Sequence, residues 1–195
     1  MTDLESSVTT PGKRDRLIAA ACQLLHEQGV ETTTLGDIAQ LADVPPGNVY
    51  YYFKTKDDII EAVVQLHLQT IRTTLASIEE NHRTPKGRLK SLVKVLAEQR
   101  DLIAEYGCPQ GSLCSELNKR DPVKDHIAAE LIRVPLTWVE DQFRFMGRRD
   151  AYDLAVTLIA TYQGTALLSN TLGDPTLMSR EARRLARWID SLSAP

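Results

Sequence analysis

Four aromatic side chains stand almost together in the stretch PPGNVYYYFKTK, residues 45–56. A tyrosine ring packs against apolar edges such as sugars and methyl groups, while its hydroxyl reaches a hydrogen-bonding oxygen. An asparagine side chain can pair with the edge of a base. Two lysines, at positions 54 and 56, add positive charge. The stretch therefore has the residue types that contact a nucleic acid, provided that its backbone leaves them free.

The stretch is predicted to form a short helix that uses few of its side chains for packing. Pro46 suits the first helical position because it has no N–H to leave unsatisfied, and eight residues of helix span about 12 Å. Val49 and Phe53 stand four residues apart and can face a core. The opposite side then holds Gly47, Tyr50, Tyr51 and Lys54, flanked by Asn48 and Tyr52. An aromatic-rich core helix is the alternative interpretation.

The preceding residues predict two further helices. Apolar residues recur on one face from Leu17 to Leu25, and Gly29 is a typical helix end. Thr34 and Asp37 have the spacing of a capping box, so a second short helix begins there. Together these elements predict a helix-turn-helix at about 34–53, whose second helix enters the DNA major groove N-terminus first.

Bulk charge does not support this interpretation. The chain has a formal net charge of −3, and residues 1–56 hold five Lys/Arg against seven Asp/Glu, a net of −2. A nucleic-acid partner is therefore argued from the position of particular residues.

Residues 13–60 resemble the DNA-binding domain of the TetR family of bacterial transcriptional regulators. The matching residues are Gly29, TTT at 32–34, DIA at 37–39, Ala42, Val44, Gly47, VYYYF at 49–53 and Lys56. The resemblance implies an all-α chain of about nine helices, with an N-terminal three-helix helix-turn-helix domain and a larger helical effector-binding and dimerisation domain. It also implies a homodimer on palindromic double-stranded operator DNA that a small-molecule effector releases.

The resemblance also implies roles for single residues. Thr34 would cap the second helix and touch a phosphate. The groove would be met by Pro46, Gly47, Asn48, Tyr50 and Tyr51, and the DNA backbone by Tyr52, Lys54 and Lys56. Three residues depart from the family pattern: Asp43 stands at a usual glycine, Pro45 at a usual capping Ser or Thr, and Pro46 at a position that is often polar. We expect Asp43 to tolerate a left-handed turn and the groove contact at Pro46 to be weaker.

The domain boundaries follow from these elements. Residues 1–10 are expected to be a disordered tail, 11–71 the DNA-binding domain and 72–195 the effector-binding and dimerisation domain. Beyond Lys56 the pattern predicts helices at 57–80, 84–107, 112–119, from Asp121-Pro122 to about 147, at 151–172 and at 177–192.

The helix at 151–172 is uncharged from Leu154 to Leu168 and apolar or small nearly all round. Such a helix must be covered on more than one side, which predicts a two-fold four-helix bundle with a second subunit. The expected interface residues are Leu154, Leu158, Thr161, Thr165, Leu168, Leu185, Trp188 and Ile189. A helix buried at the centre of a monomer is the alternative.

Two hypotheses concern what the larger domain senses. An apolar or aromatic effector would occupy a cavity lined by Leu96, Tyr106, Cys108, Trp138, Phe145 and Tyr162. Alternatively, Cys108 would respond to thiol-reactive compounds, because it lies in a Gly/Pro loop shortly before a helix N-terminus that stabilises a thiolate. Plain packing and a small buried thiol are the competing interpretations.

Other functional classes have weaker support. The four histidines are isolated, and HExxH, GxSxG, P-loop and GxGxxG patterns are missing, so we expect neither an enzyme, nor a metal, nor a cofactor. No apolar run approaches a membrane span of about 18–20 residues, and the N-terminus has no signal-peptide core, so we expect no membrane contact and a cytoplasmic protein. The prediction is a DNA-binding transcriptional regulator that acts as a repressor, and a helical adaptor that binds protein is the alternative from another class.

Overall fold

The structure is a computed structural model that describes residues 12–120 and 127–192. Within these ranges every regular element is helical, so the all-α class is confirmed. The elements are α1 (Lys13–Gln28), α2 (Leu35–Leu41), α3 (Pro46–Tyr52), α4 (Lys56–Asn81), α5 (Pro85–Glu98), α6 (Arg100–Tyr106), α7 (Pro109–Arg120), the 3₁₀ turn η1 (Ile127–Ala129), α8 (Glu130–Phe145), α9 (Ala151–Leu172) and α10 (Thr176–Ser191). The expected tail at 1–10 and the expected helix start at Asp121-Pro122 lie outside the described residues.

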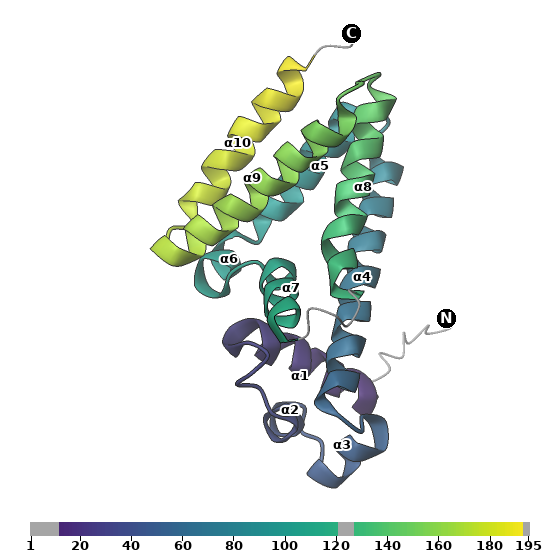
Figure 1. Ribbon diagram of the computed structural model, residues 1–195, viewed down its shortest axis with the longest axis vertical. Helices are drawn as coiled ribbons and strands as arrows, with labels where there is room; N and C mark the ends of the chain where they lie inside the picture. The colour runs from purple at the N-terminus through teal and green to yellow at the C-terminus, as the bar shows by residue number, and fades with distance from the viewer. Residues whose placement is uncertain (1–11, 121–126, 193–195) are drawn as a thin grey trace, which may run out of the picture.

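The helices form an elongated molecule with a small head at one end (Figure 1). The head consists of α1, α2, α3 and the first turns of α4. The body contains α8 alongside α4, and α9 packed on α10, with α5 behind them. Between the two, α6 and α7 lie close to α1.

The helix α4 connects the head to the body as one continuous element of about 39 Å. It begins with a capping box in which the Thr55 hydroxyl accepts the Asp58 N–H and the Asp58 carboxylate accepts the Thr55 N–H. Ile59 and Val63, near its start, are buried in the head core. Leu75, near its end, belongs to the body core. Motion of α4 therefore moves groups in both parts.

The region 84–107, expected as one helix, is two. Gln99 has φ −86° and ψ 10°, which ends α5 and begins α6 in a new direction. Because of this break, the described residues hold ten α-helices where about nine were expected for the chain. Gly107, at φ +84°, then ends α6, and α7 begins at Pro109, three residues before the expected start, because proline fits the first helical position.

The body core is formed by side chains of α4, α5, α8, α9 and α10. Phe143 of α8 and Ile159 of α9 are buried there, and the Trp188 ring of α10 contacts the Phe143 ring edge-on with centroids 5.9 Å apart. None of the described helices is both long and apolar enough to cross a membrane.

Candidate nucleic-acid interface

The helix-turn-helix is built by local interactions at its two helix starts and its turn. The Thr34 hydroxyl accepts the Asp37 N–H at 3.1 Å and the Asp37 carboxylate accepts the Thr34 N–H at 3.0 Å, which completes the predicted capping box. The hydroxyl also donates to the same carboxylate at 2.7 Å. The hydroxyl of Thr34 also holds the pKa of the Asp37 carboxyl below its ordinary value. Asp43 has φ +50°, the left-handed conformation expected where relatives carry glycine. The chain then turns into α3, which begins with Pro46 at its first position.

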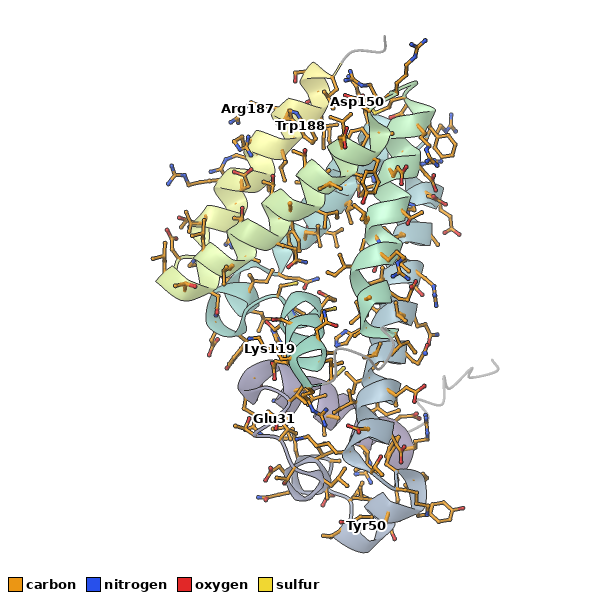
Figure 2. All side chains as sticks on the ribbon, in the orientation of Figure 1. Glu31, Tyr50, Lys119, Asp150, Arg187 and Trp188 are labelled. Atoms are coloured by element: carbon orange, nitrogen blue, oxygen red, sulfur yellow. The ribbon has the colours of Figure 1, made fainter. Side chains whose placement is uncertain are left out.

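The two faces of α3 divide as the spacing predicts. Val49 and Phe53 are 1% and 3% exposed and belong to the head core. Tyr50 and Tyr51 are 57% and 78% exposed, and Figure 2 shows Tyr50 at the end of the molecule opposite Trp188. The alternative of an aromatic core helix is therefore wrong for these two tyrosines. They are held out because the apolar pair on the inner face anchors the helix.

Tyr52 differs from its two neighbours. It is half-buried and packs against the head core. Its ring meets the Tyr51 ring edge-on, with the centroids 5.0 Å apart. Tyr52 therefore supports the orientation of the Tyr51 ring.

Gly47 lies in the first turn of α3 with open space around it. No heavy atom lies within 4 Å of the position that a Cβ would occupy, and its φ is not in the left-handed region. Glycine in a helix costs about 1 kcal/mol relative to alanine. The isolated chain therefore gives no structural reason for this glycine, whereas close approach of another molecule does.

The cations beside α3 are partly held by the protein itself. Lys54 Nζ donates to the Tyr50 carbonyl oxygen at 2.6 Å, at the C-terminal end of α3. Lys56 Nζ donates to the Glu31 carbonyl oxygen at 3.3 Å, which places the lysine beside the loop before α2. Each ammonium has further donors for a phosphate.

Sequence reasoning missed Arg14, whose guanidinium carbon lies 5.4 Å from the centre of the Phe53 ring. This contact brings a third cation to the end of α3. Because Arg14 is exposed and lies more than thirty residues before Phe53 along the chain, only the tertiary packing of α1 in the head could reveal this contact.

Thr34 caps α2 as predicted, but its hydroxyl proton is already donated to Asp37. Its backbone N–H also points to that carboxylate, at 3.0 Å. The phosphate contact of Thr34 stays a prediction, and it requires this capping box to rearrange.

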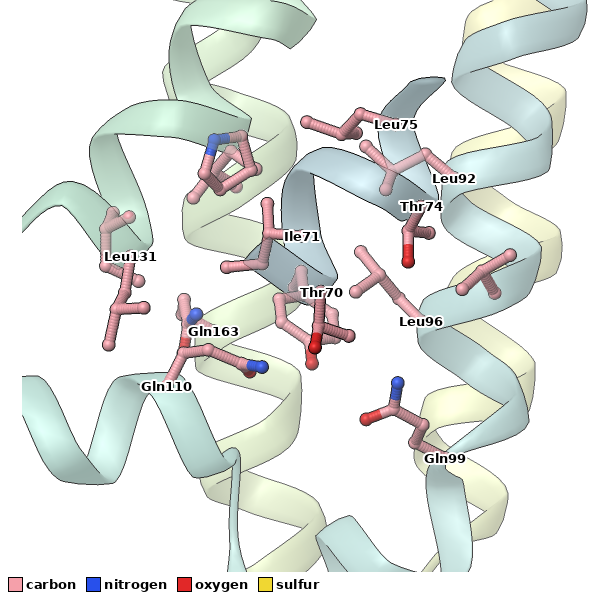
Figure 3. A pocket seen from close by; sticks show the side chains of 15 residues that line it. Thr70, Ile71, Thr74, Leu75, Leu92, Leu96, Gln99, Gln110, Leu131 and Gln163 are labelled. Carbon is pink, nitrogen blue, oxygen red and sulfur yellow. The ribbon is translucent and has the colours of Figure 1, made fainter. Parts of the chain in front are cut away.

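The body holds a cavity of about 110 Å³ between α4, α5, α7, α8 and α9, shown in Figure 3. Of the six residues expected to line an effector site, Leu96 and Tyr162 do so. The complete lining is Thr70, Ile71, Thr74, Leu75, Leu92, Val95, Leu96, Gln99, Gln110, Leu131, Ile132, Pro135, Ile159, Tyr162 and Gln163.

The other aromatic residues expected in this cavity lie elsewhere, which corrects the prediction. The Trp138 indole N–H donates to Glu79 at 2.8 Å outside the cavity. Phe145, the last residue of α8, is 67% exposed. Tyr106 packs edge-on against His26, with ring centroids 5.6 Å apart. The residue type did not predict which way each side chain points, because an aromatic ring can also pack on a neighbouring side chain or lie at the surface.

Cys108 lies behind the cavity wall, in the position before α7. Its thiol is buried and accepts the Gly111 N–H at 3.4 Å. Tyr162 and Gln163, which line the cavity, donate to the same sulfur at 3.7 Å. Burial raises the pKa of the Tyr162 hydroxyl, and the neighbouring Cys108 thiol is a smaller cause. The thiol therefore contacts the cavity wall and not the cavity itself.

The remaining two cysteines have little thiolate at neutral pH. Burial raises the pKa of Cys22 and of Cys114 to about 11. Cys114 donates its S–H to the Ala128 carbonyl oxygen at 2.9 Å. Cys114, which is buried, and Cys22, which is half-buried, therefore have the character of small packed side chains rather than of reactive groups.

The expected dimer interface falls largely on the wrong face of α9. Leu158, Leu185 and Ile189 are at most 4% exposed within one chain, so no partner can contact them appreciably. Leu154 and Trp188 pack against the same core, and Thr161 and Thr165 are half-buried. Only Leu168, at 55% exposed, lies on the open face. Because α9 is apolar or small nearly all round, its sequence does not show which face is buried within the chain. The predicted interface residues lie mostly on the face that α10 and the body core cover.

The open face of α9 carries its own apolar residues. The large ones are Tyr152, Val156, Leu167, Leu168 and Leu172, which are 39–67% exposed. Ala160 and Gly164 lie exposed between them. An exposed apolar patch of this kind indicates a surface that associates with another molecule.

The comparisons with known proteins agree with this architecture. Residues 17–63 match the family described as "Bacterial regulatory proteins, tetR family". The "HTH-type transcriptional repressor DhaR" of Mycobacterium sp. (strain GP1) is 31% identical over 165 residues, covering 79% of this chain and 80% of the relative. The "HTH-type transcriptional regulator BetI" of Burkholderia mallei (strain NCTC 10229) is 26% identical over 189 residues, 94% of each chain. The solved structure of a TetR transcriptional regulator from Legionella pneumophila superposes with a TM-score of 0.81 at 20% identity, covering 94% of this chain and 98% of that one.

A three-helix head, whose third helix α3 is the second helix of the helix-turn-helix and holds its outer face in solvent, on a larger helical body, defines the class of helix-turn-helix DNA-binding proteins. Within that class, the chain belongs to the tetR family of bacterial regulatory proteins and is a DNA-binding transcriptional regulator.

Proposed function

We propose that the protein is a transcriptional repressor that binds a palindromic operator as a homodimer and leaves it when a small molecule enters the body cavity. The observation that carries the DNA-binding part is the division of α3, where Val49 and Phe53 are buried while Tyr50 and Tyr51 are more than half exposed. The repressor part is supported by the relative that is named a transcriptional repressor.

In this proposal the first turn of α3 enters the major groove. Gly47 allows the backbone to approach, and Asn48 pairs with a base edge. Tyr50 and Tyr51 pack on sugars and thymine methyl groups, with Pro46 beside them. Tyr52, Lys54 and Lys56 reach the phosphates, as does Thr34 if its capping box opens. Arg14 joins them as a phosphate contact at the end of α3.

The division into domains is proposed along α4. Residues 11–71 include the head and the first part of this helix, and residues 72–195 make up the body. The burial of Ile59 and Val63 in the head core and of Leu75 in the body core supports a boundary within α4.

A second copy of the chain is the proposed partner of the open α9 face. Leu167, Leu168 and Leu172 would pack across a two-fold axis with α10 at the edge, forming a four-helix bundle. Two heads would then meet successive major grooves about 34 Å apart.

The helix α7 is the proposed link from the cavity to the head. Near its start, Gln110 lines the cavity. Further along, the Glu116 carboxylate accepts the Val30 N–H at 2.6 Å, just after α1 ends. At its end, Arg120 pairs with Glu31 at 3.1 Å and with Asp57 at 3.0 Å. A ligand that displaces α7 therefore changes contacts at both α1 and the start of α4, and so moves α3.

A salt titration tests the DNA-binding part. An operator is selected from random duplex DNA, and its affinity for the full chain is measured by fluorescence anisotropy between low and moderate salt. We expect the affinity to fall steeply with salt because phosphate contacts release counterions. Lys56→Ala should weaken binding and reduce the slope of log K against log salt by about one.

Lys94→Ala is the matched control. Lys94 lies on α5 in the body and pairs with Glu98, so its loss should leave the slope unchanged. A salt-independent affinity, or no selected sequence, would count against the proposed function and favour the adaptor that binds protein.

A further inference from the structure

The body cavity is lined by uncharged side chains. All fifteen of the lining residues, which lie within the described part of the chain, are aliphatic, hydroxyl-bearing or amide-bearing. A charged ligand without an opposite charge beside it loses its hydration and gains no ion pair in return. Tyr162 is the single aromatic residue of the lining, so an aromatic cage for a quaternary cation is not formed either.

The amide side chains gather at one end of the lining, and the other end is mainly aliphatic, with Thr74 beside Leu92. In Figure 3, Leu75 and Leu92 lie at the upper end of the cavity, and Gln110, Gln163 and Gln99 lie toward the lower end. Leu92 is buried, whereas Gln99 is exposed, so a ligand can enter at the polar end. A molecule that fits both ends has an aliphatic body and one polar group.

The polar end offers both a donor and an acceptor, held in place by one thiol. Cys108 donates to the Gln110 amide oxygen at 3.4 Å and accepts from the Gln163 amide nitrogen at 3.7 Å. Within residues 12–120 and 127–192, this leaves the Gln110 N–H₂ group and the Gln163 carbonyl oxygen without a protein hydrogen bond. Gly111 keeps this arrangement possible, because a Cβ there would lie 2.5 Å from Gln163 Oε1.

The volume limits the size of the ligand. A cavity of about 110 Å³ is smaller than the ~150 Å³ apolar cavity that holds benzene. Since benzene has six carbon atoms, the cavity holds a ligand of about four to six non-hydrogen atoms. So few atoms give a dissociation constant no tighter than about the micromolar range even with efficient contacts.

We propose that the effector is an uncharged short-chain aliphatic molecule whose single polar group both donates and accepts a hydrogen bond, as a hydroxyl or a carboxamide does. The aliphatic chain packs between Leu75 and Leu92, and the polar group pairs with Gln110 and Gln163. This inference rests on the proposed function, in which the body binds an effector.

Four probes of equal chain length test the chemical class. The neutral pair is 1-butanol and butanamide, and the charged pair is butanoate and butylammonium. Binding to the full chain is measured by ligand-detected NMR titration, and operator release by anisotropy in the same buffer. We expect saturable binding of the neutral pair with dissociation constants between about 1 µM and 10 mM, and binding of the charged pair at least about tenfold weaker.

Two variants locate the binding. Gln110→Leu, at a half-buried position, should weaken the neutral probes about tenfold by removing one hydrogen bond, with an unchanged unfolding temperature. Gln69→Leu makes the same change on the exposed side of α4, outside the cavity, and should change nothing. Gly111→Ala is a second way to displace the Gln163 amide, and should weaken the same probes.

The outcomes separate this inference from the function on which it rests. Three outcomes would each overturn the chemical class. The charged probes could bind as tightly as the neutral ones or more tightly, or the Gln110 and Gln69 variants could lose the same affinity. The third is a chain that still binds its operator but shows no saturable binding of the neutral probes. A chain that binds the neutral probes in the cavity but never binds DNA would keep the class and lose the proposed function.

Discussion

The outer surface of α3 and the open face of α9 both hold large side chains in solvent, yet their chemistry differs. On α3 these are Tyr50 and Tyr51, which carry hydroxyls and stand beside Lys54. On α9 they are mainly aliphatic, with Leu167 and Leu168 at 67% and 55% exposed. Hydroxylated rings beside a cation suit a hydrated polyanion. Leucines gain only from another apolar surface. The same degree of exposure therefore points to two different partners.

Both surfaces also contain a helical glycine that the single chain does not require. Gly47 on α3 and Gly164 on α9 have no heavy atom within 4 Å of a Cβ position. Each lowers helix stability by about 1 kcal/mol relative to alanine. A surface that another molecule approaches closely explains both glycines.

The largest effect is expected on α9. Leu167→Glu combined with Leu168→Glu places two carboxylates in the proposed subunit interface, where they would lose hydration without a partner. We expect a monomer in sedimentation experiments and a loss of operator affinity of more than about 100-fold, because one head replaces two.

Two other variants sharpen this result. Leu102→Glu changes an equally exposed leucine on α6 and should leave the dimer intact. Leu158→Ala removes a fully buried side chain and should lower the free energy of unfolding by about 2–5 kcal/mol, seen in urea titrations. A stable monomeric fold after Leu158→Ala would show that the assignment of the two α9 faces is reversed.

The next effect is expected on α3. Tyr51→Ala should weaken operator binding about 10- to 100-fold, the size of one good groove contact. Because the side chain is 78% exposed, the unfolding temperature should stay nearly constant. Phe145→Ala, at an aromatic residue of similar exposure on α8, is the control and should leave anisotropy titrations unchanged. Equal operator affinity of wild type and Tyr51→Ala would contradict the docking of α3.

The smallest effects should come from substitutions at the two glycines. If each glycine is kept for contact with a partner, the substitution should raise the stability of the single chain but weaken its association. Gly47→Ala and Gly164→Ala should each raise the free energy of unfolding of the single chain by about 0.5–1 kcal/mol. Gly47→Ala should nevertheless weaken operator binding a few-fold, and Gly164→Ala should raise the dimer dissociation constant. Improved stability with no change in either association would mean that these surfaces are not approached closely.

Much of the head could be predicted because its signals are local. A capping residue, a first-turn proline or a left-handed turn depends on neighbours within a few positions, so Thr34, Pro46 and Asp43 behave as their types predict. The inward pair Val49 and Phe53 follows from helical spacing alone. Arg14 was missed because its contact with Phe53 crosses between helices.

The sequence by itself determined the class of fold, the helix-turn-helix and the side of α3 that faces outward, since each depends on short-range periodicity. Tertiary structure alone decided which face of α9 is open, because a helix that is apolar all round carries no phase of its own. It also decided which residues line the cavity, because Thr70 and Gln163 line the same space although they lie far apart along the chain. A cavity of this kind is a property of how five helices pack, and no single stretch of residues encodes its shape.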